Sequence, residues 1–142
     1  MRANKGIAWG YSEKALIVVH APVVPANADW NEFMEEVRTH AGVRGVMIFA
    51  NKSRLTPLQR AEIKGWYEEH KVRGALVTNS VMMRGIVTAM NWFGVEMKAF
   101  QPEGLDAAME YIGVSPAGRP NVLVMVRNLE GMLPKAVPLA AP

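Results

Sequence analysis

Short runs in which apolar residues dominate predict the β-strands of this chain. The first two runs, Gly6–Ser12 and Ala15–Ala21, are separated only by Glu13 and Lys14, and such close spacing predicts an antiparallel hairpin. The second run is apolar on both of its faces, which indicates a strand inside the sheet rather than at its edge. Three further strands are predicted at Val46–Ala50, Gly74–Asn79 and Val95–Phe100.

The segment after the hairpin predicts a helix, because its apolar residues have the i, i+3, i+4, i+7 spacing of one buried face. These residues are Trp30, Phe33, Met34 and Val37. Asn27 or Asp29 is the predicted N-cap, since a short polar side chain can accept a hydrogen bond from a free N–H of the first turn. Gly42 and Gly45 are predicted to end the helix.

Two more helices are predicted, each after a buried strand and each behind a hydroxyl residue. Thr56 is the predicted N-cap of the first, and Pro57 takes the first helical position, where its missing N–H costs nothing. Ser80 or Asn79 is the predicted N-cap of the second, and Met83 is expected on its exposed side. The inward residues are Ile63, Trp66 and Tyr67 in the first, and Met82, Gly85, Ile86, Ala89, Met90 and Phe93 in the second.

The C-terminal part of the chain does not continue this alternation of strands and helices. A last helix is predicted over Pro102–Gly113, and Asn121–Leu129 is predicted as one more strand that extends a sheet edge or contacts a partner. Residues 130–142 are rich in proline and are predicted to form a flexible tail. The sequence therefore predicts one domain, at residues 1–129.

The predicted order of elements is β-β-α-β-α-β-α-β-α, followed by the extra C-terminal strand. Strands separated by helices need right-handed crossovers and pair mainly in parallel. The fold class predicted is therefore a single α/β sandwich, with a mixed, mainly parallel sheet and helices packed on it. A chain of 142 residues is long enough for one such core.

Composition and charge narrow the class of partner. Cysteine is absent, which excludes disulfides, Cys-zinc sites and thiol catalysis. The 16 Lys and Arg residues exceed the 13 Asp and Glu residues by three, but they are scattered, so the basic stripe of a nucleic-acid-binding protein is missing. No apolar run approaches the roughly 18 residues of a membrane span, and the apolar stretch after Arg2 and Lys5 is too short for a signal peptide. We expect a cytoplasmic protein.

The motifs of common enzymes are missing from the sequence. No glycine-rich nucleotide-binding pattern follows a predicted strand, and there is no G-x-S-x-G elbow. His20, His40 and His70 each stand alone, without metal-ligand spacing. Glu35–Glu36 and Glu68–Glu69 are expected to be solvated, because adjacent helical residues do not converge on one point. We expect no enzyme, no cofactor and no metal.

Two serines follow neighbouring buried strands and are candidates for binding. Ser80 is interpreted first as a helix cap, although free N–H groups at a helix start also bind anions, and Arg84 is close in sequence. Ser53 is flanked by Lys52 and Arg54, whose charges would favour a phosphate on the serine or on a ligand. An ordinary loop serine is the simpler interpretation of Ser53.

The order of elements resembles the STAS domain, the fold of sulfate transporters and anti-sigma-factor antagonists, whose simplest members are SpoIIAA-like proteins. The segment Ala75–Val114 resembles small, uncharacterised STAS/SpoIIAA-like proteins of bacteria, which share a TxSxxxRGxxTAxxWF helix followed by AFxPExLDxAxxYLG. The resemblance covers roughly residues 6–114. In this chain the second motif ends in Tyr-Ile-Gly.

The resemblance implies a regulatory protein–protein interaction module rather than an enzyme. In antagonist members, a serine in an Asp-Ser-Ser-Gly type of loop after the third strand is phosphorylated by a partner kinase. Here the loop reads Ala-Asn-Lys-Ser-Arg-Leu-Thr-Pro, so Ser53 and Thr56 are the nearest hydroxyls, and the aspartate and glycine are absent.

The predicted interaction surface joins the loop 51–56 to the start of the helix at Ser80. Its partner is expected to be another protein or a second copy of this chain. The alternative is a site for a small anionic ligand, such as a nucleotide, a phosphate or a lipid headgroup. The candidate residues for either role are Lys52, Ser53, Arg54, Thr56, Ser80, Met83 and Arg84.

Overall fold

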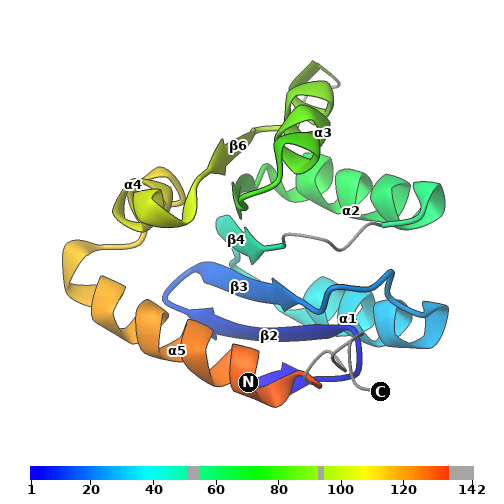
Figure 1. Cartoon of the computed structure of the whole chain (residues 1–142), viewed down its shortest axis with the longest axis horizontal. Coiled ribbons are helices and arrows are strands. Elements are labelled where there is room, and N and C mark those ends of the chain that lie inside the picture. Colours follow the sequence, from blue (N-terminus) through cyan, green and yellow to red (C-terminus); the bar gives the residue numbers. More distant parts are fainter. Residues whose placement is uncertain (51–54, 93–94, 135–142) are drawn as a thin grey trace, which may run out of the picture.

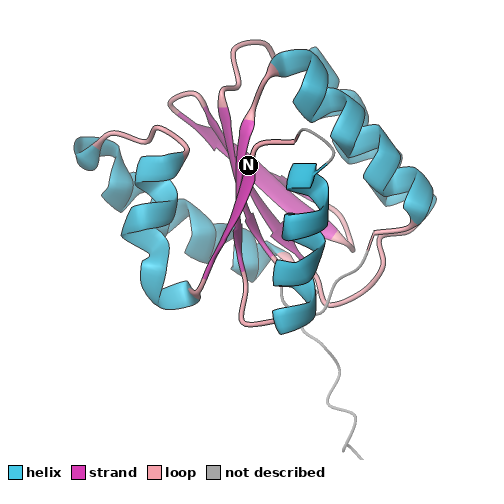
Figure 2. Cartoon of the chain, turned by 90° about the horizontal axis from the view of Figure 1, so that it is seen from above, coloured by secondary structure: helices cyan, strands magenta, loops and turns pink. Residues whose placement is uncertain are grey.

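The computed structural model contains one six-stranded sheet with helices on both faces. Figure 2 shows the sheet as a central layer between them. Residues 1–50, 55–92 and 95–134 are described, without the side chains of residues 89–92. The strands lie in the sheet in sequence order: β1 (Arg2–Ala3), β2 (Ile7–Ser12), β3 (Ala15–His20), β4 (Gly45–Phe49), β5 (Arg73–Val77) and β6 (Met97–Phe100). The predicted α/β class with a mainly parallel sheet is confirmed.

The predicted hairpin is present, and the remaining strands extend it into a parallel sheet. β2 and β3 are antiparallel and turn at Glu13, whose φ is 54°. β1, which the sequence pattern did not predict, adds a short antiparallel edge strand to β2. β3, β4, β5 and β6 are parallel neighbours. Their carboxyl ends therefore lie at one edge of the sheet, which we call the carboxyl edge.

The helices divide between the two faces of the sheet. α1 (Asn27–Thr39), α2 (Pro57–His70) and α3 (Val81–Trp92) connect successive parallel strands, and right-handed crossovers place all three on one face. α4 (Leu105–Tyr111) and α5 (Arg119–Met132) cover the other face (Figure 1). Two short 3-10 turns, Pro102–Gly104 and Pro116–Gly118, precede α4 and α5. Each face of the sheet has its own hydrophobic core.

The segment predicted as an extra C-terminal strand is helical, so that prediction is wrong. Its alternating valines suggested a strand, but Val122, Val126 and Leu129 also have helical spacing, and all three are buried in α5. Pro120 stands in the first turn of α5, where proline favours a helix start. The helix continues to Met132, beyond residue 129, where the domain was predicted to end.

Contacts with the hairpin turn fix the approach to α5. The Ser115 hydroxyl donates a hydrogen bond of 2.6 Å to Glu13 and accepts one from the Gly118 N–H at 3.2 Å. A Cβ at Gly118 would lie 2.3 Å from a Glu13 carboxylate oxygen, so a larger residue there would displace the Glu13 side chain from this contact. These long-range contacts place α5 across β2 and β3, where a helix buries its apolar stripe better than a lone edge strand would.

The inward face predicted for α3 is displaced by one residue. Val87 is buried, with 3% of its surface exposed, and Met83 is half-buried against the same core. Met82, which was predicted to head the inward face, is 57% exposed. The first two turns are apolar almost all round, so the periodicity of the sequence fixes the face poorly. The predicted inward residues Ala89, Met90 and Phe93 lie outside the described side chains.

Two predicted boundaries of α1 also differ from the structure. The N-cap position is Ala26, and no side chain caps it, so neither Asn27 nor Asp29 has the predicted role. The helix ends at Thr39, before either predicted glycine, and Gly45 belongs to β4. The predicted inward residues Trp30, Phe33, Met34 and Val37 are all buried as expected.

Candidate functional site

The ends of β4 and β5 lie side by side at the carboxyl edge, as the parallel pairing required. The Ala50 N–H donates a hydrogen bond to the Val77 carbonyl at 3.3 Å, which joins the ends of the two strands. Thr56 and Ser80 begin the helices that leave this edge. Three predicted site residues lie outside the described part of the chain: Lys52, Ser53 and Arg54.

Thr56 is the predicted N-cap of α2, and its hydroxyl is engaged there. Thr56 Oγ1 accepts from the Gln59 N–H at 3.1 Å, while Gln59 Oε1 accepts from the Thr56 N–H at 3.0 Å. Gln59 is almost fully buried, and its Nε2 also donates to the Pro25 carbonyl at 2.9 Å. This capping box therefore ties α2 to the loop after β3.

Ser80 has the predicted capping role at the start of α3. Its Oγ accepts from the Met83 N–H at 3.2 Å, and its own N–H donates to Thr78 Oγ1 at 3.0 Å. Thr78 is fully buried, so it holds the turn between β5 and α3 in place. One of the N–H groups that a bound anion would use is thus already satisfied.

The other two described candidates, Met83 and Arg84, differ from the prediction in their burial. Met83 packs against the core and is not the exposed contact that we expected. Arg84 is half-buried, and its Nε is buried without a hydrogen-bond partner among the described residues. Lys98, a second cation near α3 in sequence, lies with its Nζ 5.4 Å from the centre of the Phe100 ring, so its charge faces an aromatic surface.

Exposed apolar side chains follow three neighbouring parallel strands at the carboxyl edge. Val23 and Val24 follow β3 and are about half exposed, Leu58 in the first turn of α2 is 69% exposed, and Val81 in the first turn of α3 is 76% exposed. With Met82 they form a group that we call the edge patch. Single apolar residues on a surface are ordinary, and the edge patch differs in that its members follow neighbouring strands at one edge.

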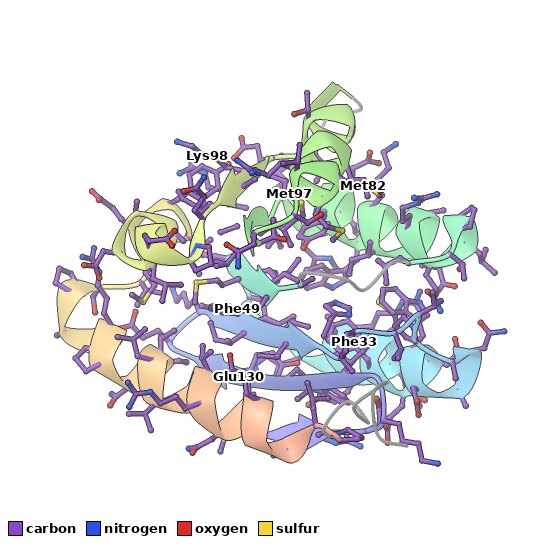
Figure 3. The ribbon with its side chains drawn as sticks, in the orientation of Figure 1. Phe33, Phe49, Met82, Met97, Lys98 and Glu130 are labelled. Atoms are coloured by element: carbon purple, nitrogen blue, oxygen red, sulfur yellow. The ribbon has the colours of Figure 1, made fainter. Side chains whose placement is uncertain are left out.

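An apolar cavity of about 300 Å³ lies between the sheet and α1, α2 and α3. Phe33, Met82 and Met97 line it, and Figure 3 shows them on the side of the sheet that carries these helices. Arg60 and Met82 are its exposed lining residues, so its opening lies near the starts of α2 and α3. Val46 of β4 and Leu76 of β5 form part of the cavity floor.

Three residues that line this cavity carry buried polar atoms without a partner. The atoms are His20 Nδ1, Trp30 Nε1 and Tyr67 Oη, and none has a hydrogen-bond partner among the described residues. Burial lowers the pKa of His20 to about 4 and raises the pKa of Tyr67, because both charged forms would lose hydration. At neutral pH both side chains are therefore uncharged.

A second hollow lies on the opposite face, between the carboxyl edge and α5. Phe49, Leu105, Arg127 and Glu130 are among its lining residues, and Figure 3 shows Glu130 on α5. His20 lines both hollows, because it ends the central strand β3. Unlike the apolar cavity, this hollow has charged residues of both signs along its wall.

Among the carboxylates, Glu36 is not the solvated charge that we expected. It is half-buried and accepts hydrogen bonds from Trp9 Nε1 and, at 3.0 Å, from Tyr11 Oη. Burial of Tyr11 and its hydrogen bond to Glu36 raise the pKa of Tyr11, and the two hydrogen bonds to Glu36 fasten α1 to β2. Glu68 and Glu69 are exposed as predicted. The described residues contain no cluster of three side chains suited to hold a metal ion.

The other histidines lie at helix ends, as the sequence suggested. His40 stacks on Tyr11 with a distance of 3.6 Å between ring centres, and His70 Nδ1 lies 3.0 Å from the Trp66 carbonyl. These contacts are structural. In the part of the chain that the structure describes, no helix combines the length and the apolar character that crossing a membrane requires.

Comparison with solved structures identifies the fold. An uncharacterised protein of the DUF3478 family from Shewanella loihica PV-4, whose crystal structure is described as having a SpoIIAA-like fold, is similar to this chain with a TM-score of 0.61 and 19% identity. The match covers 79% of this chain and 98% of that protein. This chain has a SpoIIAA-like fold. No protein-family model and no curated protein matches the sequence.

Within this SpoIIAA-like fold, sequence reasoning missed Gln59 and the apolar cavity. The Thr-x-x-Gln spacing of Thr56 and Gln59 was a visible signal for the capping box. For Trp30 and Tyr67, the available signal was a polar atom on a side chain predicted to face the core, since such atoms need a partner when buried. No sequence pattern indicated that their partners would be missing.

Proposed function

We propose that this protein is a non-enzymatic, cytoplasmic regulatory module that binds a protein partner through the carboxyl edge. The observation that carries this proposal is the edge patch, in which exposed apolar residues follow each of three parallel strands. Docking would release the water around these side chains. The hydrophobic free energy gained is roughly 25 cal/mol for each Å² of apolar surface buried. The SpoIIAA-like fold supports the regulatory character by analogy only.

The residue types at the start of α3 suit a protein interface. Methionine and arginine are enriched in such interfaces, and Met82 and Arg84 lie within the first turns of α3. Met82 is unbranched and can adapt its shape to a partner. Ser80 and Thr56 keep the two helix starts rigid through their caps, so the patch is preorganised and less ordering entropy is lost on binding.

The test compares two double variants of the same chemistry in affinity capture from the native cell extract. Val81→Glu with Met82→Glu places charges in the edge patch. Val124→Glu with Met132→Glu places them at two exposed apolar positions of α5 that do not line the hollow at the carboxyl edge, and serves as the matched control. Circular dichroism melts should first show that both variants are folded.

The wild type and the α5 control should retain the same specific protein, and the edge variant should lose it. Retention by the edge variant and loss by the α5 control would move the binding surface to α5 and contradict the proposal. A purified protein that sediments as a large homo-oligomer, and retains nothing else, would instead favour a structural role.

A small anionic ligand at the same edge is the second candidate. The observation in its favour is the buried Nε of Arg84, which lacks a partner among the described residues. A thermal-shift screen with nucleotides and inorganic phosphate tests it. A saturable shift that disappears in Arg84→Gln would support this candidate over protein docking, and no shift with any anion would rule it out.

A further inference from the structure

The cavity beneath α1, α2 and α3 extends along the parallel strands and also across them, from β3 to β6. Its floor contains Val46 and, four residues further along the same strand direction, Ala50. At about 3.3 Å per residue, these positions are about 13 Å apart. His20 lies beside Ala50 by the parallel register, so it marks the end of the cavity at the carboxyl edge.

The opposite end of the cavity is the deep end, and Tyr67 lies there. A Cβ added at Gly74 would be 3.4 Å from Tyr67 Oη and 2.8 Å from Met97 Cε. Gly74 pairs with Val46 and Met97 in the sheet. Trp30 belongs to the first turn of α1, which follows the carboxyl end of β3. The partnerless polar atoms therefore lie toward both ends of the cavity, with apolar lining between them.

The unpaired atoms indicate what kind of group is missing. Trp30 and Tyr67 are each 2% exposed, and a buried polar group without a partner costs about 1–3 kcal/mol. The indole N–H can only donate a hydrogen bond, and the tyrosine hydroxyl can donate one. A group that accepts hydrogen bonds would satisfy either atom.

The lining residues also restrict the charge of an occupant. No aspartate, glutamate or lysine is among the described residues that line the cavity, and its single arginine, Arg60, is exposed at the opening. His20 and Tyr67 are uncharged at neutral pH. A charged group inside would lose its hydration without a compensating partner, which is costly.

We propose that this cavity binds a small, uncharged molecule that is mostly apolar and carries a hydrogen-bond acceptor such as a carbonyl. A cavity of about 150 Å³ accommodates benzene, so this one has space for roughly twelve non-hydrogen atoms. Methionine and aromatic side chains supply adaptable apolar contacts along its length. The cavity opens beside the edge patch and shares Met82 with it, but its occupant is a small molecule and the experiments below test it separately from protein docking.

Calorimetric titration with three probes of one chain length tests the proposal: 2-decanone, 1-decene and decanoate. The ketone has the acceptor, the alkene lacks it, and the carboxylate adds a charge. We expect saturable 1:1 binding of 2-decanone, with decanoate at least about tenfold weaker because its charge must be desolvated. If neither neutral probe binds saturably, the proposal is wrong, since buried water alone would then satisfy the polar atoms.

Two conservative variants separate the role of the donors from that of cavity volume. Tyr67→Phe and Trp30→Phe each remove one donor, and at least one of them should weaken 2-decanone binding about tenfold relative to 1-decene. An unchanged ratio of the two affinities in both variants would show that neither donor contacts a ligand. Binding of decanoate that exceeds that of 2-decanone and is lost in Arg60→Ala would contradict an uncharged occupant.

Cavity filling provides the final control. Ile86 is half-buried and lines the cavity, so Ile86→Phe should abolish binding of both neutral probes while the protein remains folded. Thr88 is exposed on the same helix and is not among the lining residues, so Thr88→Glu should leave the affinities unchanged. If Ile86→Phe binds 2-decanone as the wild type does, the ligand occupies another place and the proposal is wrong.

Discussion

The Ser80 hydroxyl accepts a hydrogen bond from the Met83 backbone N–H, at 3.2 Å. This bond fixes where α3 begins, and therefore which of its residues face the sheet. Val87 is buried in the core, whereas Val81 and Met82, in the first turn after the cap, are exposed and form part of the edge patch. The local capping chemistry thus contributes directly to the surface that we propose for docking.

Loss of this cap should destabilise the protein modestly. Ser80→Ala removes the acceptor and should lower the free energy of unfolding by about 1 kcal/mol. Ser80→Asp should be tolerated or slightly stabilising, because aspartate also caps and its charge suits the positive end of the helix. Urea melts of both variants measure this, and stability equal to that of the wild type in both would refute the capping role.

A pair of substitutions checks the orientation of α3. Val87→Asp should lower the free energy of unfolding by about 3 kcal/mol or leave the protein unfolded, because it buries an unpaired charge. Met82→Asp introduces the same charge at an exposed position and should change stability by less than about 0.5 kcal/mol. If thermal melts show that Met82→Asp is more destabilising than Val87→Asp, the helix face predicted from the sequence is correct.

A second pair checks that α5 belongs to the core. Leu129 is fully buried, so Leu129→Ala should cost about 2–5 kcal/mol through lost burial and the cavity it leaves. Leu123 is 36% exposed, and Leu123→Ala should cost less than half as much. If denaturant melts give equal and small losses for both, α5 does not pack against β2 and β3 as the structure has it.

Stability should depend on pH through His20. Its folded pKa is about 4 and its ordinary value is 6.5, so between these values the unfolded chain binds a proton that the folded chain does not. The resulting stabilisation is fully present above pH 6.5 and is lost as the pH falls toward 4, by on the order of 3 kcal/mol. The charged residues lining the hollows beside His20 are Arg60, Arg127 and Glu130.

Urea melts of the wild type and His20→Gln across this pH range measure the effect. The variant should show a shallower dependence of the unfolding free energy on pH, whatever its absolute stability. Glu130→Gln, measured in parallel, separates the contribution of the carboxylate that shares a hollow with the imidazole. Identical slopes for wild type and His20→Gln would exclude His20 as the source.

Most of the sheet could be predicted from sequence because each parallel strand is a continuous apolar run bounded by turn residues. Thr56 with Pro57, and Ser80, marked two helix starts correctly because capping is local chemistry. Asn121–Leu129 was misassigned because its valines satisfy the period of a strand and that of a helix at once. The contacts that decide between them, from Ser115 to Glu13, span 102 positions of sequence and have no local signal.

The candidate site was predictable only in part, for a similar reason. Parallel pairing alone predicted that the ends of β4 and β5 lie side by side, as Ala50 and Val77 do, whereas Lys52, Ser53 and Arg54 lie outside the described residues. Successive residues of a helix are rotated by about 100° around its axis, so Met82 and Met83 face different directions. Because the first turn is almost wholly apolar, the sequence does not determine which of the two is buried. The apolar cavity arises from the packing of three helices on the sheet, and no short segment encodes it.

Hydrogen exchange of the protein alone and with its captured partner tests the central claim most directly. Binding through the carboxyl edge should slow amide exchange in residues 55–60 and 78–84, where the edge patch and its caps lie, and leave residues 119–132 of α5 unchanged. Slowed exchange confined to α5 or α4, with residues 55–60 and 78–84 exchanging as in the free protein, would contradict docking at the carboxyl edge.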